Sequence, residues 1–154
     1  MDLLTIIFLT GGLFLGWSLG ANDAANVFGT AVGTRMVRFK TAAIVCSLFV
    51  ILGAIISGSG TTETLSKLGS INALPGAFAA CIAAGLSVYI MTKFGLPVST
   101  TQAIVGAIVG WNLYTGSSTN IKVLITILST WILCPIIAGL IAMFFYTVTK
   151  KIIE

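Results

Sequence analysis

Four apolar runs, each close to the length that crosses a bilayer, dominate this sequence. They cover residues 3–20, 41–57, 74–92 and 121–148. About twenty apolar residues span the hydrocarbon core as a helix. Only 8% of the 154 residues are charged, against about 25% in soluble domains, so few charges remain to face water. The sequence therefore predicts an all-α integral membrane protein, multi-pass in the cell membrane and surrounded by lipid.

A fifth segment, residues 95–113, is apolar only in its second half. Its first half contains Pro97 followed by hydroxyl and amide side chains. We expect about five transmembrane or re-entrant helices, with a loop at residues 58–72. The regions around Asn22 and Ser99 are expected to be partly re-entrant. Residues 95–113 either cross the membrane or turn back.

The basic residues predict the orientation, because cytoplasmic loops are enriched in Lys and Arg. With an external N-terminus and five spans, the inside receives Arg35, Arg38, Lys40, Lys93, Lys150 and Lys151, and the outside Lys67 and Lys122. An odd number of spans places a second copy of the unit upside down. Residues 1–154 are therefore interpreted as a single inverted-repeat unit, a half-transporter. The first run lacks the basic start and cleavage site of a secretory signal, so we expect a retained span.

Small residues four apart predict close helix contacts. Gly12, Gly16 and Gly20 form such a ladder, echoed by Gly29 with Gly33 and by Gly106 with Gly110. In lipid, small residues at this spacing let helix backbones approach closely. We interpret these glycines as packing surfaces rather than as a functional site.

The scarcity of titratable residues excludes several classes of function. The chain has no histidine, which removes histidine-based triads and histidine zinc sites. Of its four acids, Asp2 and Glu154 are terminal, and Glu63 precedes Lys67 by the four residues of a helical ion pair. We expect no enzymatic activity and no cofactor. The net charge of +4 without a basic run argues against a nucleic-acid partner.

The remaining acid, Asp23, is the strongest candidate for a functional side chain. A charged residue at membrane depth costs about 2.5–3.5 kcal/mol on insertion scales, so it usually faces a pore, an ion or a partner. Asn22 and Asn26 lie on one helical face and add amide oxygens. A carboxylate with amide oxygens suits an alkali cation, which predicts sodium at Asp23 and Asn22. Alternatively, Asp23 is a helix N-cap near the membrane interface.

A second polar cluster, residues 97–102, predicts the start of a helix. Pro97 fixes the approach, and Ser99 or Thr100 caps the helix. Free backbone N–H groups at such a terminus bind anions. Three consecutive hydroxyls and the Gln102 amide exceed what a cap needs, although simple capping with back-bonding is the alternative. Two polar helix starts in one unit are typical of the broken-helix sites of secondary transporters.

Together the two clusters predict an anion and a cation in one pocket. A cation near Asp23 would offset the repulsion between the carboxylate and an anion. Phosphate near neutral pH still carries a proton to donate to a carboxylate, whereas sulfate does not, so phosphate is favoured. The predicted phosphate-binding residues are Asp23, Asn26, Ser99, Thr100, Thr101 and Gln102. The predicted cation-binding residues are Asn22, Asp23, Asn26 and Ser99.

The stretches 20–33 and 96–106, which hold the two clusters, resemble the inorganic phosphate transporter family, and the likeness runs through most of the chain. The resemblance implies ion-coupled phosphate symport driven by sodium or protons, with a sulfate-permease branch as an alternative. Family members carry two such repeats in one chain. A half-size protein that pairs, as a homodimer or with a separate half, and a fragment of a longer chain both remain open.

One position departs from the family pattern. The family often has an acid after a Ser-x-Phe sequence in the second span, whereas here Ser47-Leu48-Phe49 is followed by Val50. The number and identity of the coupled cations therefore stay open. Outside the family, we considered a small antiparallel-dimer cation antiporter that exchanges at Asp23, a membrane scaffold and an intramembrane hydrolase. The antiporter needs no anion cradle, so the hydroxyl cluster argues against it.

Overall fold

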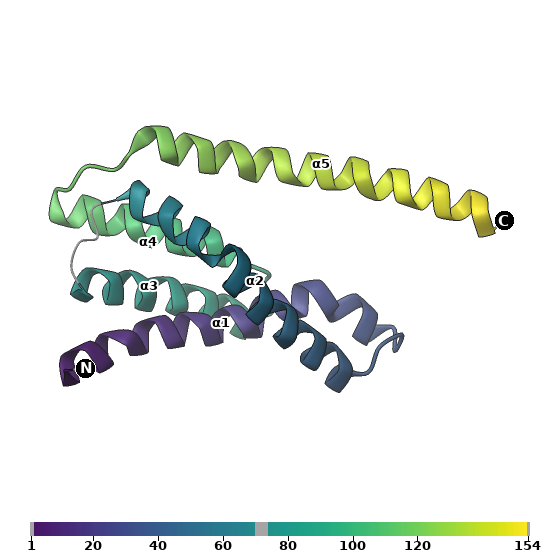
Figure 1. Cartoon of the computed structure of the whole chain (residues 1–154), viewed down its shortest axis with the longest axis horizontal. Helices are drawn as coiled ribbons and strands as arrows, with labels where there is room; N and C mark the ends of the chain where they lie inside the picture. The colour runs from purple at the N-terminus through teal and green to yellow at the C-terminus, as the bar shows by residue number, and fades with distance from the viewer. Residues whose placement is uncertain (1, 70–73, 154) are drawn as a thin grey trace. The chain divides into compact units, whose positions relative to one another are not determined.

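Five helices form the part of the chain that the computed structural model describes, residues 2–69 and 74–153 (Figure 1). They are α1 (Leu3–Gly33), α2 (Phe39–Leu68), α3 (Leu74–Lys93), α4 (Thr100–Thr115) and α5 (Ile121–Ile153). All except α4 are long and apolar enough to cross a membrane. The predicted all-α, multi-pass membrane protein is confirmed. The chain divides into two compact units, residues 1–119 and 120–154, which are described separately.

The polar stretch around Asn22 does not interrupt α1, so the prediction of a partly re-entrant segment there is wrong. The helix runs through this stretch over 31 residues. Ala21, Ala24 and Ala25 favour the helix, and the polar side chains between them find partners on α3 and α4. Asp23 is therefore not a helix N-cap. Only one of the two expected polar helix starts exists.

Helix α2 extends beyond its predicted end, because residues 58–68 are helical rather than a loop. The Thr64 hydroxyl donates a hydrogen bond to the carbonyl four residues earlier, at 2.9 Å. Glu63 forms the predicted ion pair with Lys67. Such local contacts satisfy polar side chains without ending a helix. The part of the predicted loop at residues 70–72 lies outside the described residues.

Within residues 1–119, α1 packs along α3 through two close glycine contacts. A Cβ atom added at Gly11 would lie 2.8 Å from the Phe78 ring, and one added at Gly85 would lie 2.7 Å from the Phe14 ring. Residues early in α1 meet residues early in α3, and later residues meet later ones. The two helices therefore run parallel, side by side (Figure 1).

Helix α4 returns antiparallel to α3. The Trp111 ring near the end of α4 lies against Gly76 near the start of α3, where an added Cβ would be 2.8 Å from it. The buried apolar side chains on these two helices are small or branched, namely Ala80, Ala84, Val88, Val105 and Ile108. The α3–α4 hairpin consequently brings residues 94–99 and the start of α4 to the middle of α1.

The glycine ladders predicted from the sequence do not form these contacts. At Gly12, Gly16 and Gly20, an added Cβ would have no neighbouring heavy atom within 4 Å among the described residues. The same holds for Gly29 with Gly33 and for Gly106 with Gly110. These glycines therefore contact no other described residue, and their interpretation as packing surfaces stays a prediction.

The second unit consists of α5, which continues past the predicted end at residue 148 to Ile153. The Asn120 side chain begins the helix by accepting a hydrogen bond from the Val123 amide at 3.2 Å. The helix has no charged residue between Lys122 and Lys150 and contains Pro135. A helix with this pattern is suited to lipid or to contact with other helices.

Candidate functional site

The two polar motifs of the sequence meet through one hydrogen bond. Thr100, the first residue of α4, donates its hydroxyl to Asp23 Oδ2 on α1 at 2.8 Å, across 77 residues of sequence. Thr100 is buried, with 5% of its surface exposed, and Asp23 is half-buried. No other hydrogen bond to this carboxylate is formed by the described residues. One carboxylate oxygen, Oδ1, therefore remains available to a ligand.

Asn22, next to Asp23, ties α1 to α3. Its Nδ2 donates to Thr92 Oγ1 at 2.9 Å, and its Oδ1 accepts from Asn26 Nδ2 at 3.1 Å. The Thr92 hydroxyl in turn donates to the Val88 carbonyl at 2.7 Å. Asn22 is 5% exposed, and this chain of hydrogen bonds fixes its amide orientation. Thr92 was not predicted, since a lone threonine near the end of an apolar run gives no signal of its own.

The start of α4 has the predicted form of a capped helix terminus. The Ser99 hydroxyl accepts a hydrogen bond from the Gln102 amide at 3.3 Å, so Ser99 is the N-cap. The other first-turn N–H groups have no partner within the helix. Helix termini of this kind attract anions through these groups and through the positive end of the dipole.

Some of the predicted site residues form side-chain hydrogen bonds in the structure, and others do not. Thr100 is hydrogen-bonded to Asp23, whereas the adjacent Asn22 is hydrogen-bonded to Thr92 and to the exposed Asn26. These two sets of hydrogen bonds start from neighbouring residues of α1 and together form the candidate cluster. The side chains of Thr101 and Gln102 are exposed and form no hydrogen bond with another described side chain. The roles of all these residues as phosphate or cation ligands stay predictions.

The cluster combines the groups needed for an anion and a cation. It offers carboxylate and amide oxygens from α1, a hydroxyl from α4 and the N-terminus of α4. Carboxylate, amide and hydroxyl oxygens are hard ligands that suit sodium. The helix terminus supplies donors for an anion within the same cluster.

Comparison with known proteins gives the family to which these motifs belong. Residues 19–154, which include both motifs, match the family described as the phosphate transporter family. The chain belongs to the phosphate transporter family. The predicted resemblance is therefore confirmed over most of the chain. Membership and the long apolar helices agree on a multi-pass membrane protein.

Individual relatives agree with this assignment. A Thermococcus kodakarensis protein with the name "putative phosphate permease" is 38% identical over 165 residues, covering 100% of this chain and 41% of the relative. A sodium-dependent phosphate transporter of Plasmodium falciparum is 33% identical over 165 residues, covering 99% of this chain and 25% of the relative. A solved structure of a sodium-dependent phosphate transporter superposes with a TM-score of 0.81 at 34% identity. That match covers 90% of this chain and 37% of the solved chain.

The chain thus spans less than half the length of each of these relatives. They are transporters or permeases by name, which agrees with the expectation that the protein is not an enzyme. The shared length includes both polar motifs. The substrate that the names of the longer relatives give is assigned to this chain only as a proposal.

Proposed function

We propose that this chain is one half of a sodium-coupled symporter for inorganic phosphate. It would work together with a second repeat, either another copy of itself or a separate half. Membership of the phosphate transporter family supports phosphate as the substrate. The sodium-dependent relative and structural neighbour support sodium over protons as the coupling ion.

The observation that carries this proposal is the hydrogen bond from Thr100 to Asp23. It places an acceptor-only carboxylate beside the N-terminus of α4, where backbone donors favour an anion. A phosphate that retains a proton can donate it to Asp23, whereas sulfate has no proton to donate. The predicted anion ligands from α4 are Ser99, Thr100, Thr101 and Gln102. Asp23 and Asn26 would complete the phosphate site from α1.

The cation would bind on the α1 side of the same cluster. Asn22, Asp23 and Asn26 offer oxygens there, and Ser99 is the predicted ligand from the hairpin. The hydrogen bond to Thr92 fixes the Asn22 amide, so Oδ1 is held in place. Sodium at this position would reduce the repulsion between Asp23 and phosphate. Each charge that moves inward down 100 mV also supplies about 2.3 kcal/mol.

The test is radiolabelled phosphate uptake into proteoliposomes that contain the full chain. We expect uptake driven by an inward sodium gradient, weaker uptake under a proton gradient alone, and little competition by sulfate. Asp23→Asn should reduce uptake to the level of empty liposomes while the protein remains folded. Glu63→Gln, which breaks an exposed ion pair on α2, is the matched control and should leave uptake intact. Unchanged uptake by Asp23→Asn contradicts the proposed site.

A further inference from the structure

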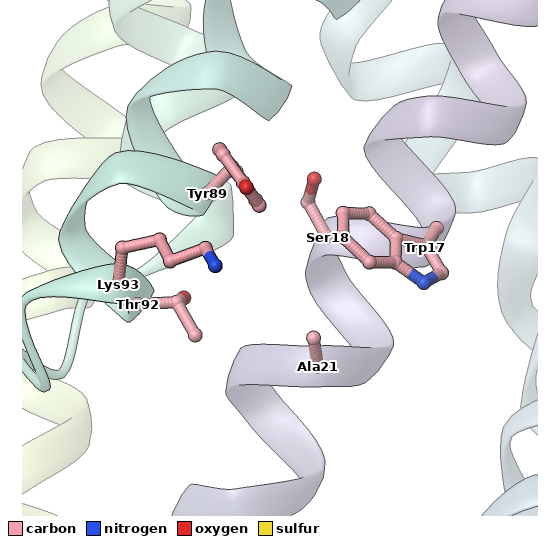
Figure 2. Close-up of a pocket in the computed structure, with 6 residues that line it drawn as sticks. All are labelled: Trp17, Ser18, Ala21, Tyr89, Thr92 and Lys93. Carbon is pink, nitrogen blue, oxygen red and sulfur yellow. The ribbon is translucent and has the colours of Figure 1, made fainter.

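A separate cavity lies between α1 and α3, beside the Asn22–Thr92 contact (Figure 2). Its volume is about 310 Å³, and its lining residues are Trp17, Ser18, Ala21, Tyr89, Thr92 and Lys93. Trp17, Ser18 and Ala21 come from α1 and face the other three residues on α3 (Figure 2). Neither Asp23 nor Thr100 lines it. The cavity is therefore distinct from the candidate transport site.

The cavity is bordered by a buried hydroxyl without a hydrogen-bond partner and by an exposed lysine. Ser18 is 1% exposed, and its Oγ has no hydrogen-bond partner among the described residues. Most buried hydroxyls are paired, so an unpaired one needs an explanation. Lys93 places its ammonium 5.6 Å from the centre of the Tyr89 ring, and no described acid forms an ion pair with it. A donor and a positive charge thus border one cavity without an anion.

The number of donors decides which kind of anion fits. The Thr92 hydroxyl already donates to the Val88 carbonyl, so it has no proton left for a ligand. Ser18 and Lys93 remain, and they can serve one or two oxygens of an anion. Free phosphate would have further oxygens stripped of water against Trp17 and Ala21, which is unfavourable. An anion that continues into an apolar body matches the cavity better.

We propose that this cavity binds the headgroup phosphate of an anionic phospholipid, with the acyl chains along Trp17. The Trp17 side of the cavity opens outward, since 57% of this residue is exposed. Trp, Tyr and Lys together are typical of the membrane interface, where headgroups lie. Lys93 is the last residue of α3 and falls on the predicted inner side, where anionic lipids are concentrated. This lipid site does not depend on the proposed transport function.

Lipid binding would also stabilise the neighbouring transport cluster. Thr92 lines the cavity and accepts the hydrogen bond that orients Asn22. A headgroup seated against Thr92 would therefore hold α3 in register with α1 at this contact. The direct consequence is thermal stabilisation of the protein by the bound lipid, because a ligand that binds only the folded state raises its stability.

The test is native mass spectrometry and thermal denaturation of the full chain in detergent, titrated with phosphatidylglycerol or with phosphatidylcholine of the same acyl chains. We expect phosphatidylglycerol to bind about tenfold more tightly, equivalent to roughly 1.4 kcal/mol. Lys93→Gln should remove this preference, whereas the control Lys40→Gln should keep it. Ser18→Ala should leave the lipid-free melting temperature unchanged or higher, because it removes an unpaired hydroxyl, yet reduce the stabilisation by phosphatidylglycerol.

Three outcomes would overturn the proposal. Equal binding of the two lipids would show that the headgroup charge is not recognised. The same loss from Lys40→Gln as from Lys93→Gln would indicate diffuse attraction to basic residues. Displacement of phosphatidylglycerol by inorganic phosphate would identify a free-anion site instead. None of these measurements involves phosphate uptake, so failure here and failure of the proposed symport are distinguishable.

Discussion

The Thr100 hydroxyl has a single proton, and in this structure that proton is directed at Asp23. As long as it is donated to the carboxylate, Thr100 has only lone pairs to offer to a ligand. In the proposed symport, sodium at Asp23 would compete for the carboxylate oxygen and release the hydroxyl to donate to phosphate. One hydrogen bond would thereby link cation binding to anion binding, with the cation favoured first.

If the Thr100 proton takes part in phosphate binding, two substitutions of similar size at residue 100 should differ in their effect. Thr100→Val keeps the shape but removes the proton, and it should raise the phosphate KM about tenfold or more, since hydrogen bonds to charged groups contribute roughly 1.5–3 kcal/mol. Thr100→Ser keeps the hydroxyl and should stay within about threefold of wild type. The measurement is the phosphate dependence of sodium-driven uptake. Equal damage by both variants would instead indicate packing at the helix start.

How far the site could be predicted depends on how local each contact is. The cap could be predicted as Ser99 or Thr100 because capping involves only neighbouring residues, and in the structure it is Ser99. Asp23 was interpreted as lying at a helix start or a re-entrant turn, which local preference allows. Its partner Thr100 and the Asn22 partner Thr92 lie on other helices, and they stabilise a continuous α1. The helical conformation at Asp23 therefore depends on contacts between helices, which local sequence preferences do not reveal.

At the scale of the helices, the sequence indicates that glycines take part in helix packing, but it does not indicate which glycines do so. Gly11 and Gly12 are adjacent, yet Gly11 lies against the Phe78 ring and carbonyl, while Gly12 has no neighbour within 4 Å among the described residues. Successive residues of a helix point in directions about 100° apart, because a turn has about 3.6 residues. Glycines four residues apart therefore share one face of a helix, but their spacing does not indicate which element packs against that face.

The adjacent glycines provide a matched pair of variants for this packing. Gly11→Ala places a methyl group 2.8 Å from the Phe78 ring and 3.2 Å from its carbonyl oxygen, so the helices must separate. Overpacking of this kind typically costs about 1–3 kcal/mol. Gly12→Ala meets no atom and should be neutral or slightly stabilising. Thermal denaturation in detergent compares the two, and a Gly12→Ala variant as unstable as Gly11→Ala would contradict the α1–α3 contact.

At the scale of the whole molecule, much of the apolar surface of the long helices is not buried among the described residues. Only 6% of the most apolar window of α2 is buried, and the α5 window is 0% buried. The glycine ladder at Gly12, Gly16 and Gly20 is bare as well. Lipid can cover apolar side chains, but a bare small-residue ladder is typical of helix–helix contact in membranes. A second repeat is thus the expected partner for part of this surface.

Pairing predicts how uptake responds when wild-type chain is mixed with Asp23→Asn chain before reconstitution. If two copies pair at random and both Asp23 residues are needed, an equal mixture should retain about a quarter of the uptake rate, since a closed dimer contains two equivalent sites. If one intact Asp23 is enough, about three quarters should remain, because only pairs of two variant chains are inactive. Mixing with Glu63→Gln chain should leave the rate unchanged.

The dependence of the uptake rate on the wild-type fraction shows whether two Asp23 residues act together. A rate proportional to the wild-type fraction, about one half in the equal mixture, means that each Asp23 acts independently of a second one. Joint action of two Asp23 carboxylates in one assembly would then be wrong. A curved response means that two Asp23 carboxylates act in one assembly. The second repeat would then be a second copy of this same chain.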